Sequence, residues 1–208
     1  DATLALKVAQ WIEPAGDRAL ALCQAAMAQA KGGNSAAALA TLQKAEGLAR
    51  NIPQKEKANA LIEIAAAQLA AGKKQQAVAT GAQALKWIRA DKNGFRNASR
   101  YKRLARVLAE AGEIQKVKEL VQPGNDMMTR SLNASARTDL AVILAEKGEV
   151  EAALEWIKRF PGRSDQKKAE AYGKIAKALA EKGKFKEALE VLKNDKSMFS
   201  EKSRALSK

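Results

Sequence analysis

The densest group of charges in this sequence is a run of five basic side chains. They are Arg96, Arg100, Lys102, Arg103 and Arg106. On a helix, Arg96, Arg100 and Arg103 share one face because of their i, i+4, i+7 spacing. Lys102 and Arg106 share a neighbouring face. Guanidinium and ammonium groups held in this way could clamp an acidic peptide, or the carboxylate at a chain terminus. The simpler alternative is a solvated helix face in a lysine-rich protein.

Side chains that carry conventional catalysis are scarce. The chain has no histidine, which removes the commonest general base and the commonest metal ligand. Its one cysteine, Cys23, has no histidine to activate it and is expected to be a small buried hydrophobe. Because no phosphate loop and no metal-spaced ligand cluster occurs, we predict no enzyme activity, no catalytic residue, no cofactor and no metal.

The overall composition is basic and typical of an all-helical protein. The 208 residues include 37 basic and 23 acidic side chains, and 47% are hydrophobic but only 4% aromatic. Such a surplus of positive charge favours acidic partners, whether nucleic acid, an anionic membrane surface or a protein. No stretch has the roughly 18–20 apolar residues that a membrane span needs. The compartment stays open between the cytoplasm and, if a leader preceded Asp1, the periplasm.

Five glycines at a nearly fixed interval indicate the elements that must position these side chains. They are Gly33, Gly72, Gly112, Gly148 and Gly183. An alanine stands seven positions before each glycine, and an alanine or valine stands five positions after it. Apolar residues follow the 3, 1, 3 spacing of an amphipathic helix on both sides. Each unit is therefore predicted to be a helix, a turn at a left-handed glycine and a second helix, stacked along the chain.

This pattern resembles the tetratricopeptide repeat. Its small residue before the turn, its turn glycine and its later alanine are all present, and residues 179–192, LAEKGKFKEALEVL, match the family's central turn. The chain departs from the family four residues before the glycine, where Gln or Leu replaces the usual aromatic residue. The resemblance implies an all-α, right-handed superhelical α-solenoid of about five helix-turn-helix repeats.

The repeat boundaries follow from the glycine positions. We place them at 1–13 (a second half-unit), 17–52, 55–91, 96–122, 131–161, 165–195 and 200–208 (the start of a further unit). Half-repeats at both ends would be unusual caps, so a segment of a longer array is the favoured interpretation. The second helix of the third unit ends before Pro123, which makes 122–130 the expected bend. All four prolines are expected between helices.

The resemblance also implies which positions line the binding groove of the first helices. In the third unit these positions hold Ser99, Lys102 and Arg106. We therefore predict a partner-binding set of six residues, namely Ser99, Lys102, Arg103, Arg106, Thr138 and Lys177. The other groove positions are mostly uncharged, which suits a peptide or a helix better than a bare polyanion.

Two recurring features have structural interpretations. Trp11, Trp87 and Trp156 each precede an isoleucine late in a second helix, which favours packing between units. Asn97 and Asn133 each begin an Asn-Ala-Ser triplet that matches the glycosylation sequon. Their equivalent places in two units favour caps of the following helices instead.

The leading functional hypothesis is a non-enzymatic interaction or scaffold module that binds an acidic peptide or partner domain through this groove. The first alternative is an RNA-binding array like the pentatricopeptide repeats, which have a similar period. Against it, only Thr138 supplies the small polar residue expected ten positions before the turn, and aromatic residues are scarce on the first helices. The second alternative is a superhelical arm or regulatory segment of a larger enzyme.

Overall fold

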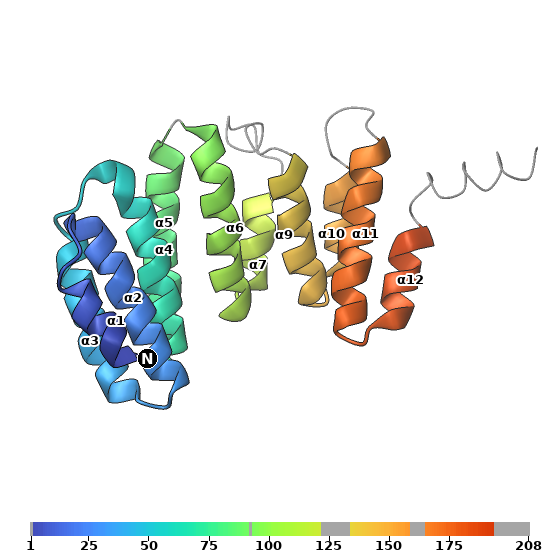
Figure 1. Ribbon diagram of the computed structural model, residues 1–208. Coiled ribbons are helices and arrows are strands. Elements are labelled where there is room, and N and C mark those ends of the chain that lie inside the picture. Colours follow the sequence, from blue (N-terminus) through green and yellow to red (C-terminus); the bar gives the residue numbers. More distant parts are fainter. Residues whose placement is uncertain (1, 92, 122–133, 159–164, 194–208) are drawn as a thin grey trace, which may run out of the picture. The chain divides into compact units, whose positions relative to one another are not determined.

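The computed structural model describes residues 2–91, 93–121, 134–158 and 165–193, and every regular element in these ranges is an α-helix (Figure 1). The chain divides into two compact units, Asp1–Glu113 and Ile114–Lys208. Within each unit, consecutive helices pair as hairpins. The predicted all-α architecture of helix, turn and helix is therefore confirmed.

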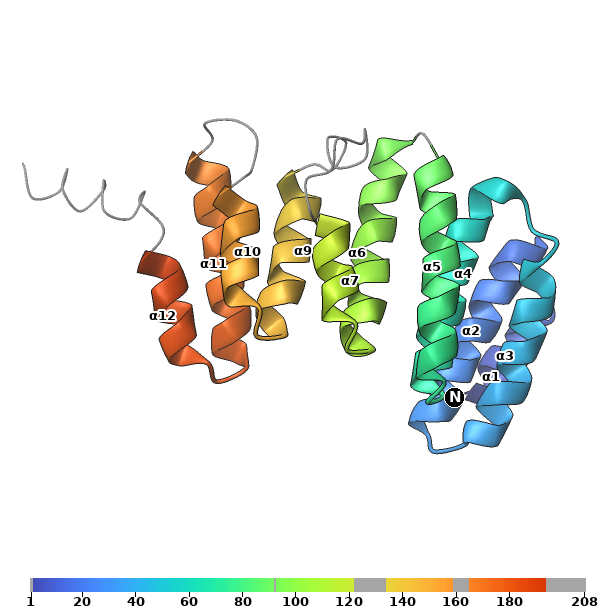
Figure 2. The same ribbon diagram turned by 180° about the vertical axis from the view of Figure 1, so that it is seen from behind.

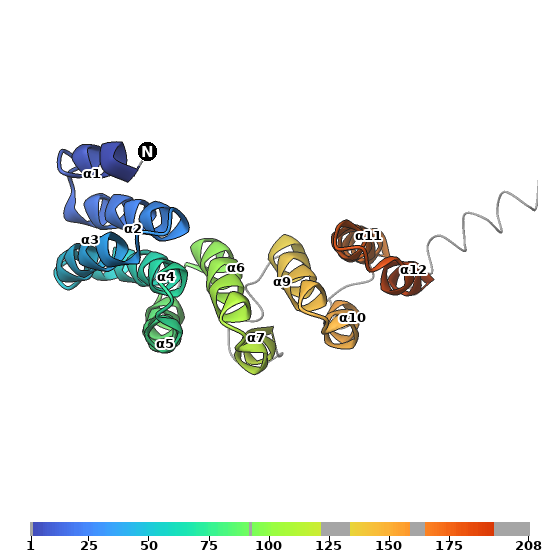
Figure 3. The ribbon, with the colours of Figure 1, turned by 90° about the horizontal axis from the view of Figure 1, so that it is seen from below.

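The first unit contains two complete hairpins and two further helices. Its helices are α1 (Ala2–Ala9), α2 (Ala15–Lys31), α3 (Ser35–Ala49), α4 (Gln54–Ala70), α5 (Lys74–Ala90) and α6 (Gly94–Glu110). Helix α2 pairs with α3, and α4 pairs with α5, as the end-on view in Figure 3 shows. Helix α1 packs on α2, and α4 also contacts α2 and α6. The first helices of successive hairpins are thus direct neighbours.

The second unit repeats the hairpin arrangement. Its helices are α7 (Ile114–Val121), α9 (Ala134–Glu146), α10 (Val150–Lys158), α11 (Asp165–Glu181) and α12 (Phe185–Lys193) (Figure 2). Helix α9 pairs with α10, α11 pairs with α12, and α9 contacts both α7 and α11. The expected bend at 122–130, the expected further unit at 200–208, Asn133 and two of the prolines lie outside the described residues.

The five glycines form five equivalent turns. Each has a left-handed backbone, with φ between 75° at Gly183 and 89° at Gly148. The N–H of the residue after each glycine donates to the carbonyl four residues before that glycine, as in the 2.8 Å bond from Lys73 to Gln68. This six-to-one bond is the Schellman arrangement, which satisfies the last carbonyls of the first helix. The predicted role of the glycines is confirmed.

Within each unit, small side chains let the two helices of a hairpin approach closely. The alanines seven positions before the glycines are Ala26, Ala65, Ala105, Ala141 and Ala176, and all are at most 5% exposed. The residues five positions after the glycines, from Ala38 to Ala188, are at most 6% exposed. Gly81 extends this close packing to α5 and α6, because a Cβ atom there would lie 3.1 Å from the Leu104 side chain.

The helix starts in the first unit follow local signals, with one correction. Pro14 and Pro53 immediately precede α2 and α4, as predicted for residues between helices. The predicted cap at Asn97 is wrong, because Asn93 caps α6 by accepting a hydrogen bond from the Arg96 N–H at 3.1 Å. Asn97 lies inside α6, is 4% exposed and donates its amide to the Asp91 carbonyl at 2.6 Å. That burial also makes it a poor glycosylation site.

The predicted packing of tryptophans between units is wrong for Trp11. Trp11 lies beyond the end of α1 and is 87% exposed. The Lys57 ammonium, from the same hairpin as Trp87, lies over the Trp87 ring at 5.3 Å from its centroid. Trp156 is buried and donates its indole N–H to the Arg137 carbonyl of its own hairpin at 3.2 Å. Two of the three tryptophans therefore link the helices of a single hairpin.

Candidate functional site

The five basic residues of the sequence run lie on α6, but they do not form one surface. Arg100 is only 3% exposed and is surrounded by acceptors. Its guanidinium donates to the Asp91 carboxylate at 2.6 Å, the Asn59 side chain at 3.0 Å and the Lys55 carbonyl at 2.8 Å. These bonds join α6 to α4 and to the loop before α6. Arg100 therefore has a structural role and is not part of an exposed cationic face. This corrects the prediction that it shares such a face with Arg96 and Arg103.

Arg103 is committed to a second set of contacts between first helices. It pairs with Glu63 of α4, whose other carboxylate oxygen accepts a 2.7 Å hydrogen bond from Gln24 of α2. All three residues lie nine positions before the turn glycine of their own hairpin, and we call this position the polar column. The polar column thus connects α2, α4 and α6 in series.

The second unit has opposite charges at the same position. Its polar column holds Asp139 on α9 and Lys174 on α11. The pKa of Lys174 is raised above its usual value, first by its hydrogen bond with Glu170 and further by the negative charge of Asp139. Each unit therefore has one pair of neighbouring first helices with complementary charges at this position.

The remaining predicted residues of α6 form a smaller surface, which we call the α6 face. It consists of Ser99, Lys102 and Arg106, spaced i, i+3 and i+7. Ser99 and Arg106 are exposed, and Lys102 is half-buried. Because the helix beneath is fixed by Arg100 and Arg103, these side chains project from an anchored backbone.

The other two predicted binding residues lie in the second unit. Thr138 on α9 is 4% exposed, which leaves little of its side chain for a partner. Lys177 on α11 is exposed and lies 3.8 Å from the Glu181 carboxylate. The structure therefore brings together four of the six predicted residues on one helix, and it places one of those four, Arg103, in an ion pair.

The lone cysteine is chemically quiet. Cys23 is fully buried on α2, and burial raises the pKa of its thiol to about 12, with smaller contributions from the negative charges of Glu63 and Glu46. A thiol with this pKa carries almost no thiolate at neutral pH and is a poor nucleophile. The expected role as a buried hydrophobe is confirmed.

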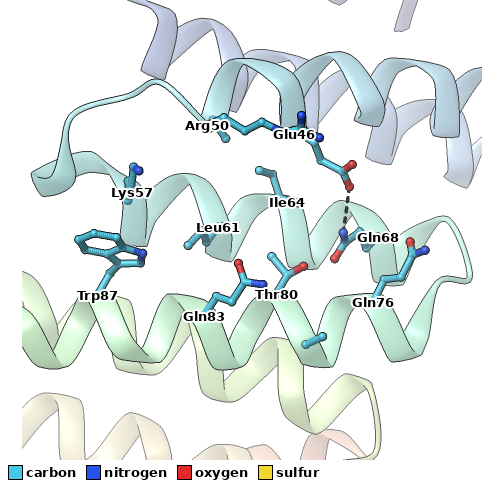
Figure 4. A pocket seen from close by; sticks show the side chains of 12 residues that line it. Glu46, Arg50, Lys57, Leu61, Ile64, Gln68, Gln76, Thr80, Gln83 and Trp87 are labelled. Atoms are coloured by element: carbon cyan, nitrogen blue, oxygen red, sulfur yellow. Dashed lines mark hydrogen bonds between the residues drawn. The ribbon is translucent and has the colours of Figure 1, made fainter.

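A cleft that the sequence did not predict lies on the other side of the first unit, and we call it the second-helix cleft (Figure 4). It has a volume of about 490 Å³, with α3 and α5 as its walls and α4 as its floor. Its lining residues are Glu46, Ala49, Arg50, Lys57, Leu61, Ile64, Gln68, Gln76, Ala79, Thr80, Gln83 and Trp87.

The two ends of the second-helix cleft differ in chemistry. Lys57 and Trp87 lie at one end, and Gln68 and Gln76 lie at the other. Gln68 is 5% exposed, and its amide nitrogen donates to the Glu46 carboxylate at 2.9 Å. The amide oxygen of Gln68 has no hydrogen-bond partner among the described residues. One end of the cleft is thus aromatic and cationic, and the other end presents an unused acceptor.

One sequence signal could have pointed to this cleft. The residue four positions before the turn glycine is leucine in three hairpins, at Leu108, Leu144 and Leu179, and all three are at most 4% exposed. In the first two hairpins the same position holds Gln29 and Gln68. A polar residue at a position that is otherwise apolar and buried departs from the packing pattern of the repeat, and such departures are expected at functional sites.

Other kinds of site are not found in the described ranges. There, no group of three or more His, Cys, Asp or Glu side chains is placed to hold a metal ion. Likewise, none of the helices that the structure describes is both long and apolar enough to cross a membrane.

Comparison with known proteins supports the fold and nothing finer. No protein-family model matches the chain, and no curated protein sequence does. A crystal structure of nearly identical TPR-like repeats, from a Podosopora anserina protein assigned as a kinesin light chain, is 18% identical and covers 93% of this chain and 100% of that one, with a TM-score of 0.52. A single-residue variant of the same protein gives the same values. The chain therefore has a TPR-like repeat fold, as the sequence predicted.

Proposed function

We propose that the chain is a non-enzymatic protein-binding module that holds an acidic segment of a partner against the α6 face. The observation that carries this proposal is the placement of Lys102 and Arg106 beside Ser99 on a first helix. Cations in this arrangement suit side-chain carboxylates of a protein. A TPR-like fold is commonly a protein-interaction module, although a fold alone does not fix a function.

The contacts beneath the α6 face support binding by a preformed surface. Arg100 and Arg103 fasten α6 to α4 through the hydrogen bonds and the ion pair described above. A helix held in this way loses little further freedom when a partner binds, so less of the interaction energy is spent on ordering it.

The same contacts argue for a protein partner over single-stranded RNA. Arg96 and Arg100 pair with Asp91, and Arg103 pairs with Glu63, which reduces the positive field at α6. Tyr101 and Tyr172, on the first helices α6 and α11, are 1% and 6% exposed. Neither ring is available to stack on a base, which is how proteins hold single strands with little sequence preference.

The test is a charge reversal at the α6 face with a matched control. Lys102→Glu/Arg106→Glu should weaken capture of the partner at least tenfold, because two attractive contacts become repulsive. The control, Lys44→Glu/Arg89→Glu, makes the same change in net charge at exposed positions on second helices of the same unit. Capture is measured by pull-down with the full chain and quantitative mass spectrometry, and helicity is checked by circular dichroism.

The proposal predicts proteins that are lost with the α6 variant and retained with the control. If both variants retain the same proteins in the same amounts, or lose them equally, the α6 face is not the binding surface.

A further inference from the structure

We propose that the second-helix cleft binds an extended peptide segment of about five residues. An acidic side chain or the C-terminal carboxylate of the peptide lies at the Lys57–Trp87 end, and a backbone N–H of the peptide donates to the Gln68 amide oxygen at the other end. This surface is separate from the α6 face. The inference stands whether or not the α6 face binds a protein.

The argument begins with the unused acceptor at Gln68. Three hairpins bury leucine at this position, so glutamine is not required for packing there. The Gln68 amide nitrogen is held by Glu46, which fixes the side chain and leaves the amide oxygen without a partner among the described residues. A buried acceptor without a protein donor needs a hydrogen bond from elsewhere to recover the free energy lost by its burial. A ligand that donates an N–H to this oxygen would recover that loss.

Gln29 provides an internal comparison. It occupies the same position in the preceding hairpin, and within the described part of the chain its amide oxygen also has no partner. Gln29 does not line the second-helix cleft, whereas Gln68 does. Of these two glutamines, only Gln68 therefore combines a spare acceptor with this cleft.

The wall formed by α5 can hold a peptide backbone. Gln76, Thr80 and Gln83 line the cleft with i, i+4, i+7 spacing, so they face it together. Each side-chain amide can donate to a peptide carbonyl and accept from a peptide N–H, and the hydroxyl can do either. Such groups hold an extended chain without demanding particular side chains.

The size of the cleft sets the length of the segment. Lys57 and Gln68 lie eleven residues apart on the floor helix α4, which corresponds to about 16 Å at about 1.5 Å per residue. An extended peptide rises about 3.3 Å per residue, so about five residues span this distance. The volume of about 490 Å³ favours small side chains along the segment.

The charges of the cleft set the direction of the segment. Arg50 and Lys57 both line it, and neither forms an ion pair with another residue in the part of the chain that the structure describes. Glu46, the acidic residue of the lining, already accepts a hydrogen bond from Gln68. The cleft therefore attracts negative charge at the end where the Lys57 ammonium lies over the Trp87 ring.

A neutral oligosaccharide fits these features less well. A sugar could use the amide side chains, but it would not use the two cations. Its apolar face would also have to compete with Lys57 for the Trp87 ring. The experiment below includes this alternative.

The binding test uses the full chain labelled with ¹⁵N and three probes. The first is acetyl-Ala-Ala-Ala-Ala-Asp with a free C-terminal carboxylate, the second is acetyl-Ala-Ala-Ala-Ala-Asn-amide, and the third is cellotriose. We expect the acidic peptide to shift the Trp87 indole signal and the Gln68 side-chain amide signal together, because they mark opposite ends of the cleft. The neutral peptide should bind at least fivefold more weakly, and cellotriose should leave both signals unchanged.

Variants assign the binding to the named side chains. Arg50→Ala/Lys57→Met should weaken the acidic peptide at least tenfold, whereas the matched control Lys44→Ala/Arg89→Met should not change its affinity. Gln68→Leu should weaken binding of the acidic peptide, because it removes the acceptor. It should also raise the denaturation midpoint of the protein, because it restores the leucine of the other hairpins. Lys102→Glu/Arg106→Glu should bind the peptide as the unaltered chain does, which separates this site from the α6 face.

Three results would overturn the inference. They are equal peptide affinity in Arg50→Ala/Lys57→Met and in its control, shifts caused by cellotriose but not by the peptides, and no shift of either signal at millimolar peptide.

Discussion

At the scale of single residues, the turn glycines and the clustered cations behave differently. Each turn glycine has the left-handed backbone that its place in the repeat requires, and the bonds that close the turn come from the backbone alone. The cations depend on their surroundings, because Arg100 is buried whereas Arg106, six residues later, is exposed. Backbone geometry is encoded locally, and the accessibility of a long side chain is not.

Gly72→Ala tests the contribution of the backbone alone. No atom would lie within 4 Å of the new methyl group, so the left-handed φ of 77° is the main source of strain. We expect a loss of about 1–2 kcal/mol in the free energy of unfolding, measured by urea denaturation. The control is Gly47→Ala inside α3, where the site is equally open and the same substitution should stabilise by about 0.5–1 kcal/mol. Equal effects at both positions would contradict this account.

At the scale of helices, the loop between α5 and α6 is organised around Asp91. The pKa of this carboxyl is held below its usual value, first by the backbone N–H of Asn93, 2.9 Å away, and then by Arg100 and Arg96. The same carboxylate accepts the 2.6 Å bond from Arg100. The ionised Asp91 carboxylate thus accepts hydrogen bonds both from the backbone at the start of α6 and from the buried guanidinium that joins α6 to α4.

This arrangement predicts a pH dependence of stability. Because folding lowers the pKa of Asp91, its contribution is fully present above the unfolded value of about 3.9 and is lost as pH falls through the lower folded value. Asp91→Asn should be less stable than the unaltered chain at about pH 7 but should lose less stability between about pH 4 and pH 2. Thermal unfolding across this range measures the effect. Glu110→Gln removes an exposed carboxylate from the other end of α6 and serves as the control.

At the scale of the whole molecule, the dominant property is the net charge of +14. A charge of this size attracts any polyanion, so weak association with nucleic acid is expected without a dedicated site. Specific binding should depend instead on where the exposed cations lie.

A salt titration distinguishes these two kinds of binding. In a gel-shift assay, a uridine oligonucleotide should bind at about 50 mM salt and be released by about 200 mM, because counterion release supplies the affinity. Lys102→Glu/Arg106→Glu and Lys44→Glu/Arg89→Glu should reduce this binding equally, since both lower the net charge by the same amount. Binding that persists at about 200 mM salt, or that depends on only one pair of residues, would support the RNA-binding alternative instead.

The sequence predicted the hairpins better than the surfaces. Ala65 and Gly72 recur because a close helix crossing and a left-handed turn each admit few residue types, so a single chain reveals them. Whether Arg103 is ion-paired depends on Glu63, which lies forty residues away on another helix. The second-helix cleft draws its lining from three helices, and its one local sign was a glutamine where other hairpins have leucine.

The polar column has a consequence for how such a chain could have evolved. Hairpins made by duplication share one backbone and could in principle exchange places, or pair with the wrong neighbour during folding. Glu63 meets Arg103 in one unit, and Asp139 lies close enough to Lys174 to raise its pKa in the other. Replacing the Glu63 hairpin by the Lys174 hairpin would bring Lys174 beside Arg103, so the charge at this one position favours some orders of the hairpins over others.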